Sequence, residues 1–226
     1  MARGVFISGT DTGVGKTVVA TALLRALVAE GYAAIGMKPV AAGITIGETI
    51  NADVRALMSA ASVAAALADV NPFSYEPPIA PHLAAGSTGR AIDLERIATA
   101  YASLALVAEA VVVEGAGGLL VPLGSGIDML DIPVRLELPV LLVVGIQLGC
   151  LNHALLSSLA LEVRGVRLAG WVANRIDPAM HEGDANVAAL VTRLPAALVA
   201  DIGWNPDGAP TAKFDGAMLR LLGFTR

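Results

Sequence analysis

Gly9-Thr10-Asp11-Thr12-Gly13-Val14-Gly15-Lys16-Thr17 is the stretch that decides the fold of this 226-residue chain. The apolar residues Val5 to Ile7 lead into it and are typical of a strand, while the pattern from Lys16 to Glu30 predicts a helix. A glycine-rich turn between a strand and a helix N-terminus binds phosphate, because backbone N–H groups and the helix dipole both face the anion. The sequence therefore predicts a nucleoside-triphosphate site. The alternative is a glycine turn before an ordinary helix.

The residue types in this loop suit that chemistry. Gly13 and Gly15 let the backbone curl, so that N–H groups on both sides of Val14 point at one place. Lys16 offers a mobile positive charge to the β- and γ-phosphates, and the Thr17 hydroxyl is placed to bind Mg²⁺. We therefore expect residues 13–17 to hold the phosphates of ATP.

The composition narrows the class of protein. Hydrophobic residues make up 55% of the chain and charged residues 15%, as expected for alanine-rich helices around buried parallel strands. The net charge is −5 and no basic run occurs, which argues against a nucleic-acid partner. The longest apolar run, Leu138 to Ile146, is far shorter than the roughly 20 residues that a bilayer requires. No signal-peptide pattern is visible, and the single Cys150 fits a reducing compartment, so we expect a cytoplasmic protein without a membrane partner.

Strand-like and helix-like stretches alternate along the chain. Strands are predicted at residues 33–37, 111–113, 140–145, 167–173 and 197–201, helices at 93–109, 152–164, 181–194 and 215–222, and loops at 41–50 and 71–90. This alternation predicts one α/β domain over residues 1–226, a P-loop-type, mostly parallel sheet with helices on both faces in three layers. Ligands of such sheets bind beyond the carboxyl ends of the strands. That rule gathers the glycine-rich loop, Lys38, Glu114 and Asn174 at one edge.

Three charged residues at that edge are candidates for the site. Glu114 closes an apolar strand, where a second acidic Mg²⁺ group is expected, and the glycines after it let substrate approach the backbone. Asp53 is either a further metal ligand or only a helix N-cap, a role that Asn51 would fill equally well. Lys38 ends a strand beside the phosphate site and is either an anion-binding group or a surface lysine.

The chain resembles the dethiobiotin synthetases, ATP-dependent enzymes of biotin synthesis. The resemblance rests on blocks that follow the family's order from residue 5 to about 175: the glycine-rich loop, Lys38-Pro39-Val40, Asn51-Ala52-Asp53, Asn71-Pro72, Pro81-His82, Val113 to Gly118, Leu148 to Ala154 and Gly170 to Asn174. The glycine-rich loop alone is shared with many ATPases, whereas the full set is specific. After Ile176 the match fades.

The resemblance implies a reaction of 7,8-diaminononanoate, CO₂ and ATP. CO₂ forms a carbamate on one amine, and the carbamate oxygen takes the γ-phosphoryl group to give a mixed anhydride. ADP forms in that transfer. The second amine then closes the cyclic urea of dethiobiotin, and this step releases phosphate. Lys16 and Lys38 would neutralise the charge that gathers between carbamate and γ-phosphate, with Thr12 near the reacting groups.

The resemblance also implies the ligand contacts. Mg²⁺ on Thr17, Asp53 and Glu114 would bridge phosphate oxygens, and the Asn174 amide would bind the adenine edge. The family forms homodimers with shared active sites. The substrate-binding residues implied are Lys38, Gly117 and Gly118 together with Gly149, Cys150, Leu151 and Asn152, which reach the other subunit's substrate, where free N–H groups suit a carboxylate tail.

Two positions depart from the family pattern. Ala42 stands where some relatives carry a hydroxyl residue, and Gln147 where a basic residue can occur.

An alternative function is that of a regulatory or partitioning ATPase, which acts as a nucleotide switch. Such proteins share the Gly-x-Gly-Lys-Thr loop but carry an extra lysine at its start. Asp11 stands at that position here, which weighs against the switch.

Overall fold

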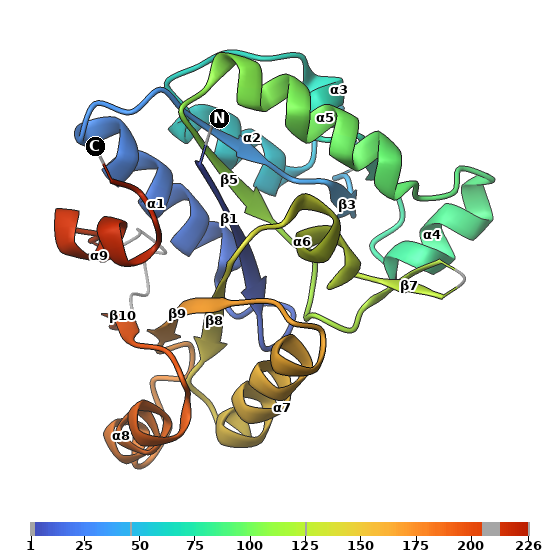
Figure 1. Ribbon diagram of the computed structural model, residues 1–226. Coiled ribbons are helices and arrows are strands. Elements are labelled where there is room, and N and C mark those ends of the chain that lie inside the picture. The colour runs from blue at the N-terminus through green and yellow to red at the C-terminus, as the bar shows by residue number, and fades with distance from the viewer. Residues whose placement is uncertain (1–2, 46, 125, 205–212, 226) are drawn as a thin grey trace.

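The computed structural model describes residues 3–45, 47–124, 126–204 and 213–225 and shows a central sheet between two layers of helices (Figure 1). Six strands follow one another across the sheet in the order β2 (Ala34–Met37), β5 (Ala110–Glu114), β1 (Arg3–Gly9), β8 (Val140–Gly145), β9 (Leu168–Asn174) and β10 (Leu198–Ile202). Every neighbouring pair is parallel. The predicted α/β class is confirmed.

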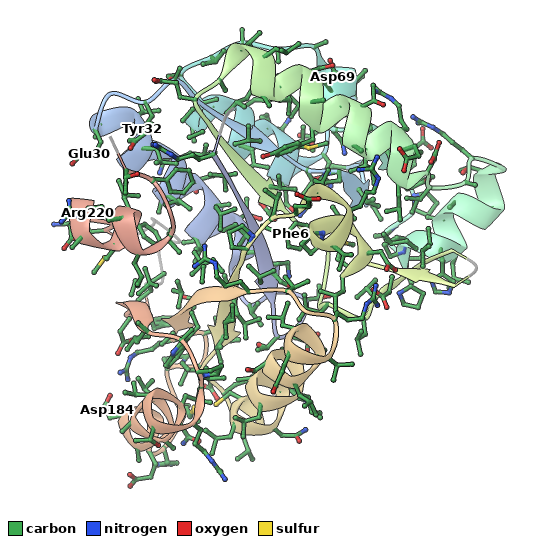
Figure 2. The ribbon with its side chains drawn as sticks, viewed as in Figure 1. Phe6, Glu30, Tyr32, Asp69, Asp184 and Arg220 are labelled. Atoms are coloured by element: carbon green, nitrogen blue, oxygen red, sulfur yellow. The ribbon has the colours of Figure 1, made fainter. Side chains whose placement is uncertain are left out.

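Successive side chains of the central strands point to opposite faces of the sheet and pack into two separate apolar layers. Val5 and Ile7 of β1 pack on one face, whereas Phe6 between them packs on the other. The first face is covered by α1 (Lys16–Ala29), α2 (Ala52–Ala60) and α9 (Gly216–Leu221), and the second by α5 (Leu94–Val107), α6 (Asp131–Leu136), α7 (Cys150–Val163) and α8 (Gly183–Arg193). Figure 2 shows Phe6 in the interior and Asp184 and Arg220 on the outside.

The two segments predicted as loops contain regular structure. Residues 41 and 42 of the first segment, with Val40 before them, form β3 (Val40–Ala42), which pairs in parallel with β4 (Phe73–Tyr75) of the second. The second segment also holds α4 (Pro81–Thr88), so the prediction of an irregular connection over 71–90 was wrong. Strands of three residues are too short to show a period, and a proline that suggests a loop is also favourable in the first turn of a helix.

Several smaller elements had no predicted counterpart. They are α3 (Leu67–Val70), α6 and the antiparallel pair β6 (Pro122–Gly124) and β7 (Ile127–Asp128). Helix α7 begins at Cys150, two residues before the predicted start, because Gly149 takes a left-handed conformation with φ of 95° and serves as the N-cap. The bounds of β8 are those predicted, since a fully buried strand is a continuous apolar run.

The parallel sheet brings one end of each strand to a common edge. β1 runs into the glycine-rich loop, Lys38 follows β2, and Glu114 and Asn174 are the last residues of β5 and β9. No helix of the described ranges is both long and apolar enough to cross a membrane. The sheet therefore assembles the predicted site residues at one edge, as the strand-end rule requires.

Candidate active site

The glycine-rich loop is shaped to receive an anion. Gly13 and Gly15 have φ of 77° and 90°, a left-handed conformation that side chains with a Cβ rarely adopt. Gly15 is also the N-cap of α1, and no side chain caps that helix start. The first N–H groups of a helix have no partner inside it, so the start of α1 offers donors and a positive dipole end to a phosphate.

Lys16 lies at this helix start and is mostly buried. Its Nζ donates a hydrogen bond to the backbone carbonyl of Asp11 at 2.8 Å. Burial and then the positive charge of Lys38 lower the pKa of Lys16 to about 8, although nearby carboxylates, Glu114 foremost, oppose this shift. The hydrogen-bond acceptor of Lys16 is thus an uncharged carbonyl. An anionic ligand would bind the ammonium group more strongly than this carbonyl does.

Lys38 is held by a buried network of acceptors. Its Nζ donates to Glu114 Oε1 at 2.6 Å, to Asp53 Oδ2 at 2.8 Å and to the Gly115 carbonyl at 3.2 Å. These three bonds engage all three ammonium hydrogens. Burial opposes the charge on Lys38, but the Glu114 carboxylate and then the Asp53 carboxylate outweigh it and raise the pKa of Lys38. Lys38 is thus a fixed, buried ammonium ion and not a surface lysine.

Asp53 lies in the first turn of α2, next to the residue that caps this helix. The Asn51 side chain accepts the Asp53 N–H at 2.9 Å and caps α2, which confirms one of the two capping alternatives. The Asp53 carboxylate is therefore not used as a cap. Burial would raise the pKa of Asp53, but the Lys38 ammonium outweighs it and lowers that pKa.

The residues expected to hold Mg²⁺ lie together. Thr17 Oγ1 donates to Glu114 Oε1 at 2.8 Å, and the same oxygen accepts from Lys38. Glu114 is fully buried, and its second oxygen, Oε2, has no hydrogen-bond partner within the described structure. A buried carboxylate oxygen without a donor is a position at which a cation fits. No group of three or more His, Cys, Asp or Glu residues in the described ranges forms a metal site, but Mg²⁺ is commonly bound by one or two carboxylates with water and phosphate oxygens.

These groups open into one cavity of about 760 Å³. The lining residues from the loop are Thr12, Gly13, Gly15, Lys16 and Thr17. Lys38 lines it after β2, Asn51 and Asp53 at the start of α2, and Glu114, Ala116, Gly117 and Val121 from the end of β5 and beyond. A further wall is formed by residues 78–81 at the start of α4. A connection as long as residues 71–90 is expected to form a lid or wall of a site, but none of these four residues was predicted individually.

The remaining predicted residues lie outside the cavity lining. Asn174 lies behind the glycine-rich loop, where its Nδ2 donates to the Val14 carbonyl at 2.8 Å. Gly118 lies against the loop, since a Cβ there would be 3.4 Å from the Gly9 carbonyl oxygen. The block Gly149 to Asn152 forms the start of α7 and does not line this cavity of the same chain.

The fold and this site define a class, the P-loop nucleotide-binding α/β proteins. Two solved structures share the fold: the septum site-determining protein MinD complexed with Mg-ADP from Pyrococcus horikoshii (TM-score 0.62, 17% identity, 98% of this chain and 89% of that one) and a ParA family ATPase from Chlorobium tepidum (TM-score 0.54, 14% identity, 98% and 89%). The family described as AAA domain matches residues 3–212.

Closer relatives give the family. An ATP-dependent dethiobiotin synthetase BioD from Aromatoleum aromaticum is 48% identical over 98% of both chains. A protein of the same name from Nitrosospira multiformis is 50% identical over 88% of this chain and 87% of its own. The chain belongs to the ATP-dependent dethiobiotin synthetase family and is an enzyme, which confirms the resemblance found in the sequence.

Proposed function

We propose that the chain catalyses the ATP- and Mg²⁺-dependent conversion of 7,8-diaminononanoate and CO₂ to dethiobiotin, ADP and phosphate. The observation that carries this proposal is the presence of two buried ammonium groups, Lys16 and Lys38, in one cavity beside the phosphate loop. Joining a carbamate to a γ-phosphate concentrates negative charge, and fixed positive charges stabilise it most where water is excluded. The 48% identity to a named synthetase, over nearly the full length of both chains, supports the choice of substrate.

The two lysines are suited to different sides of the reaction. Lys16 bonds a neutral carbonyl at the start of α1, so its ammonium group can move to the β- and γ-phosphates. Lys38 is tied to two carboxylates and one carbonyl, so it stays in place and presents a fixed charge to the carbamate. Thr12 and Gly117 line the same cavity, which supports a place for Thr12 near the reacting groups.

The proposed reaction forms a mixed anhydride and then breaks it down. The carbamate oxygen attacks the γ-phosphorus, and the bond between that phosphorus and the ADP oxygen breaks. The second amine then attacks the carbonyl carbon of the anhydride, the C–O bond breaks, and phosphate leaves with the former carbamate oxygen. The proton of the attacking amine passes to solvent or to phosphate.

Mg²⁺ would be held by Thr17, Asp53 and Glu114, and when bound it would supply positive charge to the phosphate oxygens. The donor set fits a hard cation because it consists of oxygens, one of which, Glu114 Oε2, is buried without a partner among the described residues. The Asp53 side chain is 41% exposed, whereas that of Glu114 is fully buried, so Asp53 is the carboxylate that can also contact a ligand in the cavity.

A homodimer would complete the substrate site. Leu156, Leu159 and Val163 on α7 are 57%, 53% and 75% exposed, and their spacing of three and four puts them on one helix face. Leu148, just before the helix, is 95% exposed. A second copy covering this apolar face would bring the start of its α7 towards the first copy's substrate. The free thiol of Cys150 supports a reducing, cytoplasmic location.

An isotope experiment tests the proposed chemistry. Because phosphate leaves with an oxygen of the carbamate, ¹⁸O from labelled CO₂ should appear in the phosphate released with the cyclic urea. Mass spectrometry of phosphate from a short reaction without carbonic anhydrase measures this transfer. Phosphate that carries ¹⁸O only from labelled water would contradict the anhydride and would indicate simple hydrolysis of ATP.

A further inference from the structure

Asn174 contacts the phosphate loop from behind. It is the last residue of β9, is 8% exposed, and its Nδ2 donates to the Val14 carbonyl at 2.8 Å across a separation of 160 residues. A carbonyl oxygen only accepts, so the amide nitrogen of Asn174 must face the loop. One of the two N–H donors of the Asn174 amide is therefore used by the loop.

Gly15 gives the contact its second feature. A Cβ on Gly15 would lie 2.1 Å from Asn174 Nδ2, a distance at which atoms overlap. The Asn174 amide thus fills the space in which any other residue at position 15 would carry its side chain. It packs directly on the left-handed turn from which α1 starts, the turn whose N–H groups are placed to bind phosphate.

Other contacts tie the same part of the loop to β8. The Thr10 N–H donates to the Val143 carbonyl at 2.9 Å. At Gly145 a Cβ would lie 2.7 Å from Ile176 Cδ1 and 2.8 Å from Val14 Cγ1, so these two side chains pack tightly over that glycine. The Val14 side chain is held by packing, while its carbonyl is held by Asn174. Without Asn174, the peptide group between Val14 and Gly15 loses its side-chain hydrogen bond and its packing partner together.

We propose that Asn174 is a positioning residue of the phosphate loop: by holding the Val14 carbonyl and packing on Gly15, it fixes the loop in its anion-binding shape. The inference rests on the nucleotide site proposed above and differs from a contact with the base. A residue that only reads adenine matters for nucleotides alone. A residue that shapes the loop matters for any ligand with a chain of phosphates, including one without a base.

Inorganic tripolyphosphate separates the two roles. Its dissociation constant and that of ATP, both with excess Mg²⁺, are measured by calorimetry for the wild type and for Asn174→Ala. Loss of one buried hydrogen bond that pre-shapes the loop should weaken both ligands by a similar factor of about 10. Weaker ATP binding with unchanged tripolyphosphate binding would overturn the proposal in favour of base contact, and unchanged binding of both would overturn it as well.

Asn186→Ala is the matched control. Asn186 lies on α8 away from the loop, and its Nδ2 also donates to a backbone carbonyl, that of Glu182, at 2.8 Å. This variant should keep both affinities. A role of Asn174 in folding alone would lower the melting temperature without changing tripolyphosphate affinity, and that result contradicts the proposal.

Two further comparisons keep the test decisive. If Asn174→Ala does not fold, Asn174→Ser, which removes less of the side chain, is measured in the same way. A wild-type protein that binds no tripolyphosphate would contradict the nucleotide site and the inference together. Wild-type binding that the variants retain would contradict only the role of Asn174.

Discussion

Replacing Lys38 by methionine should destabilise the fold, because it leaves buried negative charge without a partner. Methionine keeps much of the apolar stem and removes the ammonium group. Glu114 is fully buried, and loss of one partner of a buried ion pair costs about 3 kcal/mol or more. Asp53 is 41% exposed, so its unpaired charge adds less than about 1 kcal/mol. We expect the free energy of unfolding to fall by about 3 kcal/mol.

Urea unfolding followed by the fluorescence of the buried Trp171 measures this loss. The lowered pKa of Asp53 adds stability above its ordinary pKa of 3.8, which is lost as the pH falls through the folded value. The raised pKa of Lys38 adds stability below its ordinary pKa of 10.5, which is lost as the pH rises through the folded value. The difference between wild type and variant should therefore be largest between these two pH values.

Two further variants test the reasoning. Lys213→Met removes an exposed lysine and should change the free energy of unfolding by less than about 0.5 kcal/mol. Adding Glu114→Gln to Lys38→Met removes the uncompensated charge and should restore part of the lost stability. If Lys38→Met is as stable as Lys213→Met, the buried network does not carry the energy assigned to it.

Three other predictions concern the reaction. Lys16→Ala and Thr17→Ala should each lower turnover about 10²- to 10³-fold with the fold intact, since both act on bound nucleotide; turnover within twofold of wild type would oppose their assignment. ATP affinity should fall as the pH rises through about 8, the lowered pKa of Lys16, because the neutral amine attracts phosphate less, and a titration of Lys16→Ala should lack this dependence. Asn152→Asp should raise the KM for the diamine by repelling its carboxylate tail across the dimer, with relief by salt and little change in ATP affinity; an unchanged KM, measured against salt, would remove Asn152 from the substrate site.

Much of the fold could be predicted because its central strands are long and buried on both faces. The stretch that became β8 is continuously apolar, so its bounds were correct. The glycine-rich loop predicted the order of strand, turn and helix, because no other common element requires that pattern. The strand-end rule then predicted that Lys38 and Glu114 lie at the same edge, and they form an ion pair there.

The short elements beside the site could not be predicted in the same way. β3 and β4 owe their existence to pairing with each other, which a run of three residues does not encode. Helix α4 starts at a proline within a proline-rich segment, where local signals favour a loop. β3 and the start of α4 line the cavity, and β3 is held by its pairing with β4, so the shape of the site depends on contacts between segments distant in sequence.

The roles within the site show the same limit. The sequence left Asp53 as either a cap or a metal ligand, and the cap turned out to be Asn51, which leaves the Asp53 carboxylate for Lys38. The contact between Asn174 and the loop had no local signal at all, because it joins residues that only the parallel sheet brings together. The strand-end rule predicted which residues meet at this edge of the sheet, whereas the contacts that each of them makes required the fold.

Formation of the cyclic urea is the most direct test of the proposed function. The wild-type protein, Mg-ATP, ¹³C-labelled bicarbonate and 7,8-diaminononanoate are incubated together, and the products are analysed by mass spectrometry, with ATP hydrolysis followed in parallel. We predict a product with the mass of dethiobiotin that carries one ¹³C, formed in equal amount with ADP and only when all components are present. ATP hydrolysis that proceeds without the diamine, yields no urea and is stimulated by DNA or lipid vesicles would contradict the account and would favour a nucleotide switch.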